Sequence, residues 1–133
     1  MTKRLRIVEK SSLSSGTKRK GKINKRTKRL DYLLLDVVDE TMKQVFRKTG
    51  TTVIYDFLEN NSHLRRGEIA EKPEVFSAGL ERLMVSAARV IEILILKNLY
   101  RRLGLAFEEK EGYEFSDYVK ELRKFLNSNF VLA

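Results

Sequence analysis

The residues with the clearest chemical potential are eight Lys and Arg side chains within the twelve positions from 18 to 29. Each cation that neutralises a phosphate releases condensed counterions, so such binding is electrostatic and weakens steeply with salt. Arg also makes paired hydrogen bonds to phosphate, and Gly21 lets the chain follow a groove closely. The stretch contains no aromatic residue that could stack on bases and no base-reading motif. It therefore predicts contacts with the phosphate backbone and not sequence readout.

Charge is distributed unevenly along the chain. Residues 1–30 carry twelve cations against Glu9 alone, a net charge of +11, whereas residues 31–133 carry 15 cations and 17 anions, a net charge of −2. This asymmetry indicates a polyanionic partner for the N-terminal segment and not for the remainder. The expected nucleic-acid contacts are Lys3, Arg4, Arg6, Lys18, Arg19, Lys20, Lys22, Lys25, Arg26, Lys28 and Arg29.

Several partners fit a basic segment of this kind. Structured RNA offers phosphate-lined crevices on several sides of such a segment, whereas duplex DNA offers a simpler surface. We therefore favour RNA over DNA. The alternatives are a solubilising tail, a targeting segment and an anionic membrane, although the segment lacks the apolar face of a membrane anchor.

A second group of cations lies farther along the chain. Arg65 and Arg66 stand in a polar connector, and Lys97, Arg101 and Arg102 stand at the end of a predicted helix. These five residues are candidates for a secondary basic surface. The alternative interpretation is that they complement the negative end of a helix dipole and supply ordinary surface charge.

Signals for enzymatic chemistry are weak. The chain has no Cys and one His, His63, which excludes a Cys-based or multi-His metal site within one chain. The acidic residues between Glu108 and Glu114 lack the alternating ligand spacing of a calcium loop, and no glycine-rich phosphate loop is present. We expect His63 and this acidic loop to be solvated. We expect a non-enzymatic protein with no cofactor, no metal and no small-molecule substrate.

The helices that must position these residues follow from apolar spacings of three and four. These spacings predict helices over about 28–48, 51–62, 73–103 and 116–126, with Gly50 ending the first helix and Thr51 capping the second. The expected fold class is all-α, a compact bundle of four to five helices around a long central helix, with an extended basic N-terminal arm. Residues 1–29 form that arm, disordered when free because it has few apolar groups, and residues 30–133 form the helical domain.

The central helix is the stretch from Pro73 to Leu103. Pro73 suits the first helical position, and Gly104 suits the left-handed residue that stops a helix, with Leu105 folding back in a Schellman cap. Residues 90–96 are apolar almost all round the helix, so we expect burial on most sides. A break near residues 85–86 is an alternative, because Ser86 suits a second N-cap.

Membrane and export signals are also missing from the pattern. No apolar segment of the kind found in secretory signals follows the basic N-terminus, and the apolar run 90–96 is shorter than a membrane span. We expect a cytoplasmic protein with no membrane partner.

Four stretches together carry a family resemblance. They are TVIY at 52–55, EKPEVF at 71–76, ILKNLY at 95–100 and GYEFSDY at 112–118. In this order and spacing, residues 31–126 resemble the small helical domain called the Nitrosopumilus output domain. The resemblance implies an archaeal, helical, non-enzymatic module and leaves the basic arm outside. It supplies no activity, and its usual setting implies a role in output or interaction.

The layout of a compact domain with a basic extension also resembles that of ribosomal proteins. It implies ribosomal RNA, and neighbouring ribosomal proteins, as partners. Our hypothesis is therefore an RNA-binding ribosomal or ribosome-associated archaeal protein whose arm contacts RNA phosphates. The alternatives are a protein-interaction or output module in archaeal regulation, and a DNA-binding chromatin or regulatory protein.

Overall fold

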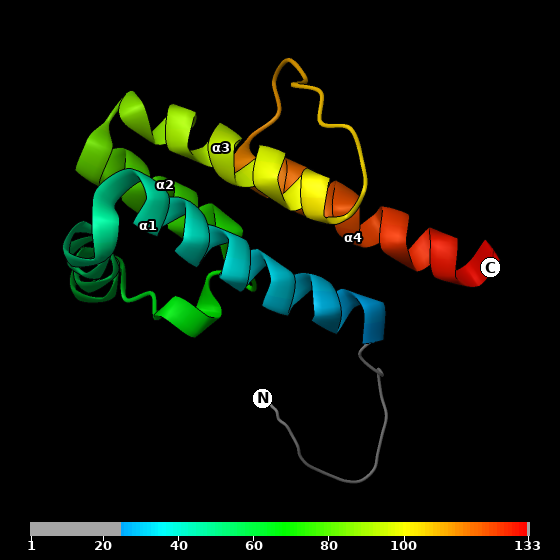
Figure 1. Cartoon of the computed structure of the whole chain (residues 1–133), viewed down its shortest axis with the longest axis horizontal. Helices are drawn as coiled ribbons and strands as arrows, with labels where there is room; N and C mark the ends of the chain where they lie inside the picture. Colours follow the sequence, from blue (N-terminus) through cyan, green and yellow to red (C-terminus); the bar gives the residue numbers. More distant parts are fainter. Residues whose placement is uncertain (1–24, 133) are drawn as a thin grey trace, which may run out of the picture.

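The computed structural model describes residues 25–132 of the chain, with side chains from 28 to 128. This part forms four α-helices and a short 3-10 turn and contains no strand (Figure 1), which confirms the all-α fold class. The elements are α1 (Lys25–Ser62), η1 (Arg66–Glu68), α2 (Pro73–Met84), α3 (Ala87–Arg102) and α4 (Phe115–Leu132).

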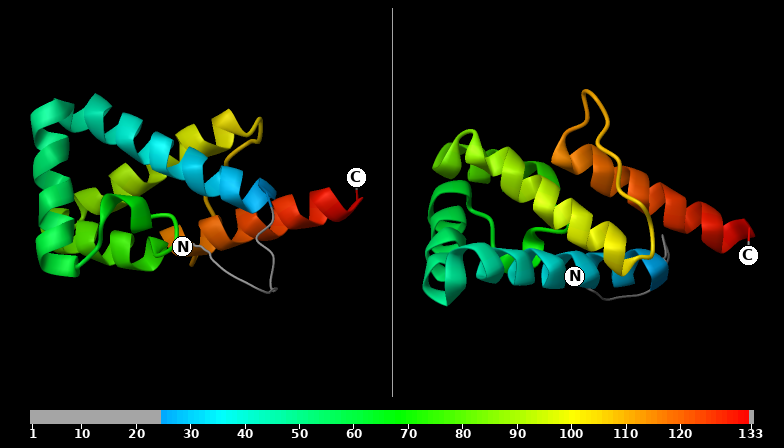
Figure 2. Two further views of the ribbon diagram at one scale, coloured as in Figure 1. Left: turned by 90° about the horizontal axis from the view of Figure 1, so that it is seen from below. Right: turned by 45° about the horizontal axis from the view of Figure 1, so that its top comes forward.

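The helices form a bundle in which each of the four contacts the other three. Figure 2 shows the first part of α1 crossing α3 (left), with α4 extending past both at the end where the chain terminates. Burial of apolar side chains, the dominant favourable term in folding, holds the bundle together. The buried side chains include Leu34, Val37, Phe76, Leu80, Ile95, Leu96, Leu99, Phe115, Tyr118 and Val119.

Helix α1 begins and bends at residues other than those predicted. It begins at Lys25, so the helical unit starts five residues before the expected boundary at residue 30. It bends at Arg47, where φ is 64° and ψ is −176°, and not at Gly50. Thr51 is therefore no N-cap. Its Oγ1 donates a hydrogen bond of 2.7 Å to the Arg47 carbonyl, a bond to the preceding turn that favours bending.

Gly50 matters to this bend for a reason other than ending a helix. A Cβ atom at residue 50 would lie 2.8 Å from Cβ of Phe46, closer than real Cβ atoms approach. The missing side chain lets the two parts of α1 meet (Figure 2, left), and the second part then packs across the end of the bundle.

The predicted central helix is two helices. Val85 has a φ of 54° and a ψ of −121°, which separates α2 from α3 near the break considered from Ser86, although Ser86 makes no side-chain cap. The expectation of burial on most sides is wrong for part of α3. Ile91 is buried, but Val90 is 61% exposed and Leu94 is 37% exposed, because the neighbouring helices leave one face of α3 uncovered.

The end of α3 is the Schellman cap that the sequence predicts. Gly104 has a φ of 74°, and its N–H donates to the Arg101 carbonyl at 3.0 Å. The Leu105 N–H donates to the Tyr100 carbonyl at 2.8 Å. These bonds satisfy carbonyls that a helix end otherwise leaves unpaired, and they fix the backbone beneath Arg101.

Candidate nucleic-acid interface

The predicted arm falls mostly outside the part of the chain that the structure describes. Seven of its candidate contacts lie there, namely Lys3, Arg4, Arg6, Lys18, Arg19, Lys20 and Lys22. Lys25 and Arg26 are the first two residues of α1, and Lys28 and Arg29 are exposed on its surface. Four of the predicted contacts therefore belong to a helix and not to an extended arm.

The start of α1 reverses the usual charge pattern of a helix. Its first turn contains no acidic residue and several cations, at the end where the helix dipole is already positive. Asp31, the first acidic side chain, forms an ion pair of 2.7 Å with Arg123 of α4. An anion at this end would relieve repulsion among like charges, which makes the start of α1 a favourable place for phosphate.

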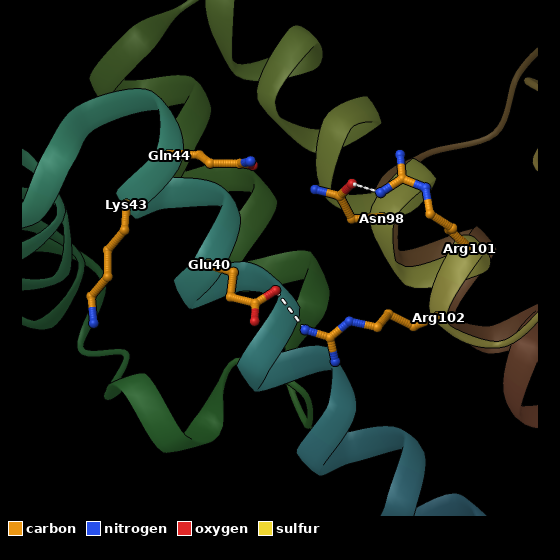
Figure 3. A pocket seen from close by; sticks show the side chains of 6 residues that line it. All are labelled: Glu40, Lys43, Gln44, Asn98, Arg101 and Arg102. Atoms are coloured by element: carbon orange, nitrogen blue, oxygen red, sulfur yellow. Dashed lines mark hydrogen bonds and ion pairs between the residues drawn. The ribbon is translucent and has the colours of Figure 1, made fainter.

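A second basic region lies where α1 packs against α3. An open pocket of about 680 Å³ is lined by Glu40, Lys43 and Gln44 of α1 and by Asn98, Arg101 and Arg102 of α3 (Figure 3). Three of these six side chains are cationic and one is anionic. Sequence reasoning missed Lys43 and Gln44 because nothing in their spacing along the chain places them beside Arg101. It also missed Asn98, although Asn98 lies three residues before Arg101 on α3, a spacing at which side chains of one helix meet.

The two arginines of this pocket are held differently. Arg102 forms an ion pair with Glu40, and both side chains are substantially exposed, so the pair adds little stability. Arg101 donates from Nη1 to Oδ1 of Asn98 at 3.0 Å. Asn98 in turn donates from Nδ2 to Oγ1 of Thr41 at 3.0 Å, and Thr41 is 1% exposed. The Arg101 guanidinium is therefore oriented by a chain of contacts that begins in the core.

The structure separates Arg66 from this pocket. Arg66 forms an ion pair of 2.7 Å with Asp39, and its guanidinium lies 4.7 Å from the centre of the Tyr55 ring. Tyr55 donates to the same carboxylate at 3.0 Å, and Lys43 pairs with it at 2.9 Å. Burial alone would raise the pKa of Asp39, but the hydrogen bonds from Lys43 and Tyr55 and the charge of Arg66 outweigh burial and lower it. Arg66 thus fastens η1 to α1.

The five candidates for a secondary basic surface therefore divide. Arg101 and Arg102 share the pocket, and Lys97 is exposed one turn before Arg101 on α3. Arg65 is exposed, and its backbone N–H donates to Glu68 at 2.9 Å. Asp39 and Glu40 are neighbours in α1 but pair with different elements. Asp39 pairs with Arg66 of η1, and Glu40 pairs with Arg102 of α3. Of the five candidates, Arg101 and Arg102 are the two that line one pocket.

A buried acid lies away from these cations. The Ser77 hydroxyl of α2 donates to Oε2 of Glu92 at 2.6 Å, and Arg89 approaches Oε1 of Glu92 at 3.9 Å. Burial raises the pKa of Glu92, against the Ser77 hydrogen bond and the Arg89 charge. Arg89 also donates to the Tyr113 carbonyl at 3.2 Å and pairs with Glu109 at 3.6 Å. The Arg89 contacts tie the acidic loop to α3, and the Ser77–Glu92 hydrogen bond ties α2 to α3.

The other features singled out in the sequence are exposed. His63 lies on the surface, as do Glu108, Glu109, Glu111 and Glu114. Between residues 25 and 132 no group of three His, Cys, Asp or Glu side chains is arranged to hold a metal ion. None of the helices in that range has the length and apolar content required to cross a membrane.

Comparisons with known proteins leave the family open. No protein-family model, curated protein or solved structure matches this chain. The resemblance to the Nitrosopumilus output domain therefore stays a prediction from its four motifs.

Proposed function

We propose that this chain is a non-enzymatic RNA-binding protein, ribosomal or ribosome-associated, whose basic N-terminal segment contacts RNA phosphates. One observation carries the proposal. Eight cations occupy residues 18–29 and residues 1–30 have a net charge of +11, whereas residues 31–133 have a net charge of −2. Residues 31–133 are nearly neutral, so they do not strongly repel a polyanion. Residues 1–30 carry the charge that attracts it.

The start of α1 supports the same partner. Lys28 and Arg29 are exposed there, on a helix whose first turn has no acidic residue. The cations of residues 18–22 and those at the start of α1 therefore follow one another in the sequence with no acidic residue between them. In a folded RNA, phosphates surround a crevice on several sides and can contact both parts at once.

The test uses substitution and not truncation. Removing residues 1–29 would also remove the first five residues of α1, next to Leu30, which is buried. A variant with Lys18, Arg19, Lys20 and Lys22 all changed to Gln lowers the charge by four before α1 begins. The matched control changes four exposed cations of the helical unit to Gln, namely Lys48, Arg82, Lys120 and Lys124.

The expected result is selective. Each lost phosphate contact should lower affinity about four- to five-fold at 0.15 M salt, so the variant with all four residues changed should bind a folded ribosomal RNA fragment about 250- to 600-fold more weakly. The control should stay within a few-fold of the wild type. Equal losses in the two variants would show that only net charge matters. In competition, folded RNA should displace the protein from duplex DNA, and preferential binding to DNA would favour a chromatin or regulatory protein instead.

A protein-interaction module is the second candidate, and the uncovered face of α3 favours it. Val90 and Leu94 lie about one turn apart, and Val85 precedes them at 73% exposure. Adjacent exposed apolar side chains are a common feature of docking surfaces. Under this candidate, nucleic-acid-free protein sediments as an oligomer that Val90→Lys dissociates. A monomer in both cases would exclude self-association through this face.

A further inference from the structure

Arg101 is a cation whose direction is set by the core. Thr41 is buried in α1, and through Asn98 it fixes the guanidinium of Arg101. Both ends of the Asn98 amide are used, because its oxygen accepts from Arg101 and its nitrogen donates to Thr41. A side chain that is already oriented loses less conformational freedom when it binds a ligand.

The other charged residues of the pocket leave Arg101 free to bind an anion. Glu40 is paired with Arg102, and Lys43 points away from Arg101 toward Asp39 (Figure 3). Within the described residues, no carboxylate forms an ion pair with Arg101. Arginine carries five N–H donors in a planar fork, and one Arg101 nitrogen is engaged with Asn98, so further donors face solvent.

The pocket suits a phosphate on a polymer better than an enclosed small molecule. It is open and is lined by charged groups and by the amides of Gln44 and Asn98. Paired hydrogen bonds from a guanidinium match the geometry of phosphate oxygens. Glu40 balances the charge of Arg102, and the end of the α3 dipole contributes about −0.5 charge here, which is less than the +1 of Arg101.

The pocket is also aligned with the basic start of α1. Arg29 and Glu40 are eleven residues apart, about three helical turns, so they share one face of α1. The distance along the axis is roughly 16 Å. Asp36 is exposed on the same face between Arg29 and the pocket, so an RNA molecule that contacts both must pass this carboxylate. Contact at one point raises the effective concentration of the RNA at the other.

We propose that the pocket between α1 and α3 is a second phosphate-binding point for the same RNA, with Arg101 as its oriented donor and Asn98 as the residue that positions it. This inference rests on the proposed function, because it assigns a second contact to the RNA that the basic segment binds. Arg102 holds Glu40 away from the bound phosphate.

The experiment measures RNA affinity against salt for full-length protein carrying Arg101→Gln. The control is Arg82→Gln, which makes the same charge change on α2, where the guanidinium contacts only the Asn61 carbonyl among the described residues. Arg101→Gln should lower affinity about five-fold at 0.15 M salt and reduce the magnitude of the log–log slope by about one. Arg82→Gln should change neither quantity.

A third variant separates orientation from charge. Arg101→Lys keeps the charge but loses the planar fork and its contact with Asn98, so the slope should stay while affinity falls between wild type and Arg101→Gln. If wild type binds RNA and Arg101→Gln behaves as Arg82→Gln does, the pocket is no phosphate site although the proposed function stands. If wild type itself fails to bind folded RNA, the proposed function and this inference fail together.

Discussion

Replacing Val85 by glycine should stabilise the protein, whereas replacing a valine within a helix by glycine should destabilise it. Its φ of 54° with ψ of −121° is a conformation that β-branched residues rarely adopt. Strain of this kind costs about 1–3 kcal/mol, and glycine adopts the same conformation without it. The variant Val85→Gly should therefore remove the strain at the junction of α2 and α3.

Two losses oppose this gain. The greater freedom of glycine in the unfolded chain costs about 1 kcal/mol. Val85 is 73% exposed, so about a quarter of the roughly 2 kcal/mol from full burial is lost, about 0.5 kcal/mol. For a strain near 2.5 kcal/mol, the net stabilisation is about 1 kcal/mol, or a rise in Tm of about 3 °C.

Val90→Gly is the matched control. Val90 is similarly exposed but lies within α3. Glycine there should cost about 1 kcal/mol through helix propensity and lost contacts. Thermal and urea unfolding followed by circular dichroism should therefore move the two variants in opposite directions. If Val85→Gly loses as much stability as Val90→Gly, a single continuous helix runs through residue 85 and the reasoning is wrong.

Three further perturbations test the packing. Burial raises the pKa of Glu92, so the folded state binds the carboxyl proton more tightly than the unfolded state does. The free energy of unfolding should therefore fall as pH rises from about 4.5 through the raised pKa, and Glu92→Gln should flatten that part of a urea-unfolding pH series. Gly50→Ala places a methyl carbon 2.8 Å from Cβ of Phe46 and should lower stability by about 1–2 kcal/mol despite the better helix propensity of alanine; an unchanged Tm would contradict the tight bend. Arg123→Leu removes the partner of Asp31 and a 2.6 Å hydrogen bond to the Ala70 carbonyl, and it should cost about 2 kcal/mol in denaturant unfolding, whereas a neutral result would mean that this ion pair is dispensable.

The sequence predicts where a helix begins or ends when one or two residues determine that boundary. Pro73 begins α2, and Gly104 with Leu105 ends α3 in the expected cap. Both depend on backbone chemistry within a few residues, which a sequence displays directly. The all-α class follows in the same way from apolar spacing.

The errors arise where distant parts of the chain decide. Val53 is 57% exposed although it is an apolar residue in a helix, because the bend at Arg47 turns the second part of α1. Val90 is exposed because the neighbouring helices leave one face of α3 uncovered. Periodicity identifies an apolar helix, but it does not say how many neighbours the helix has.

The two parts of the candidate interface differ in the same respect. The basic segment is evident from composition alone. The pocket depends on a hydrogen bond between Thr41 and Asn98, which are 57 residues apart, and on the pairing of Glu40 with Arg102, which are 62 residues apart. The sequence does not distinguish Arg101 from Arg66, because both are cations outside the basic segment. The fold shows that Arg66 pairs with Asp39, whereas Arg101 has no ion-pair partner among the described residues.

The central claim is that the basic segment binds RNA by neutralising phosphates, and the salt dependence of binding tests it most directly. For six to ten phosphate contacts, a plot of log affinity against log salt should have a slope of roughly −5 to −9 on duplex and a shallower slope where strands are single. Changing Lys18, Arg19, Lys20 and Lys22 to Gln should reduce its magnitude by about three. Identical slopes for wild type and this variant would contradict the account.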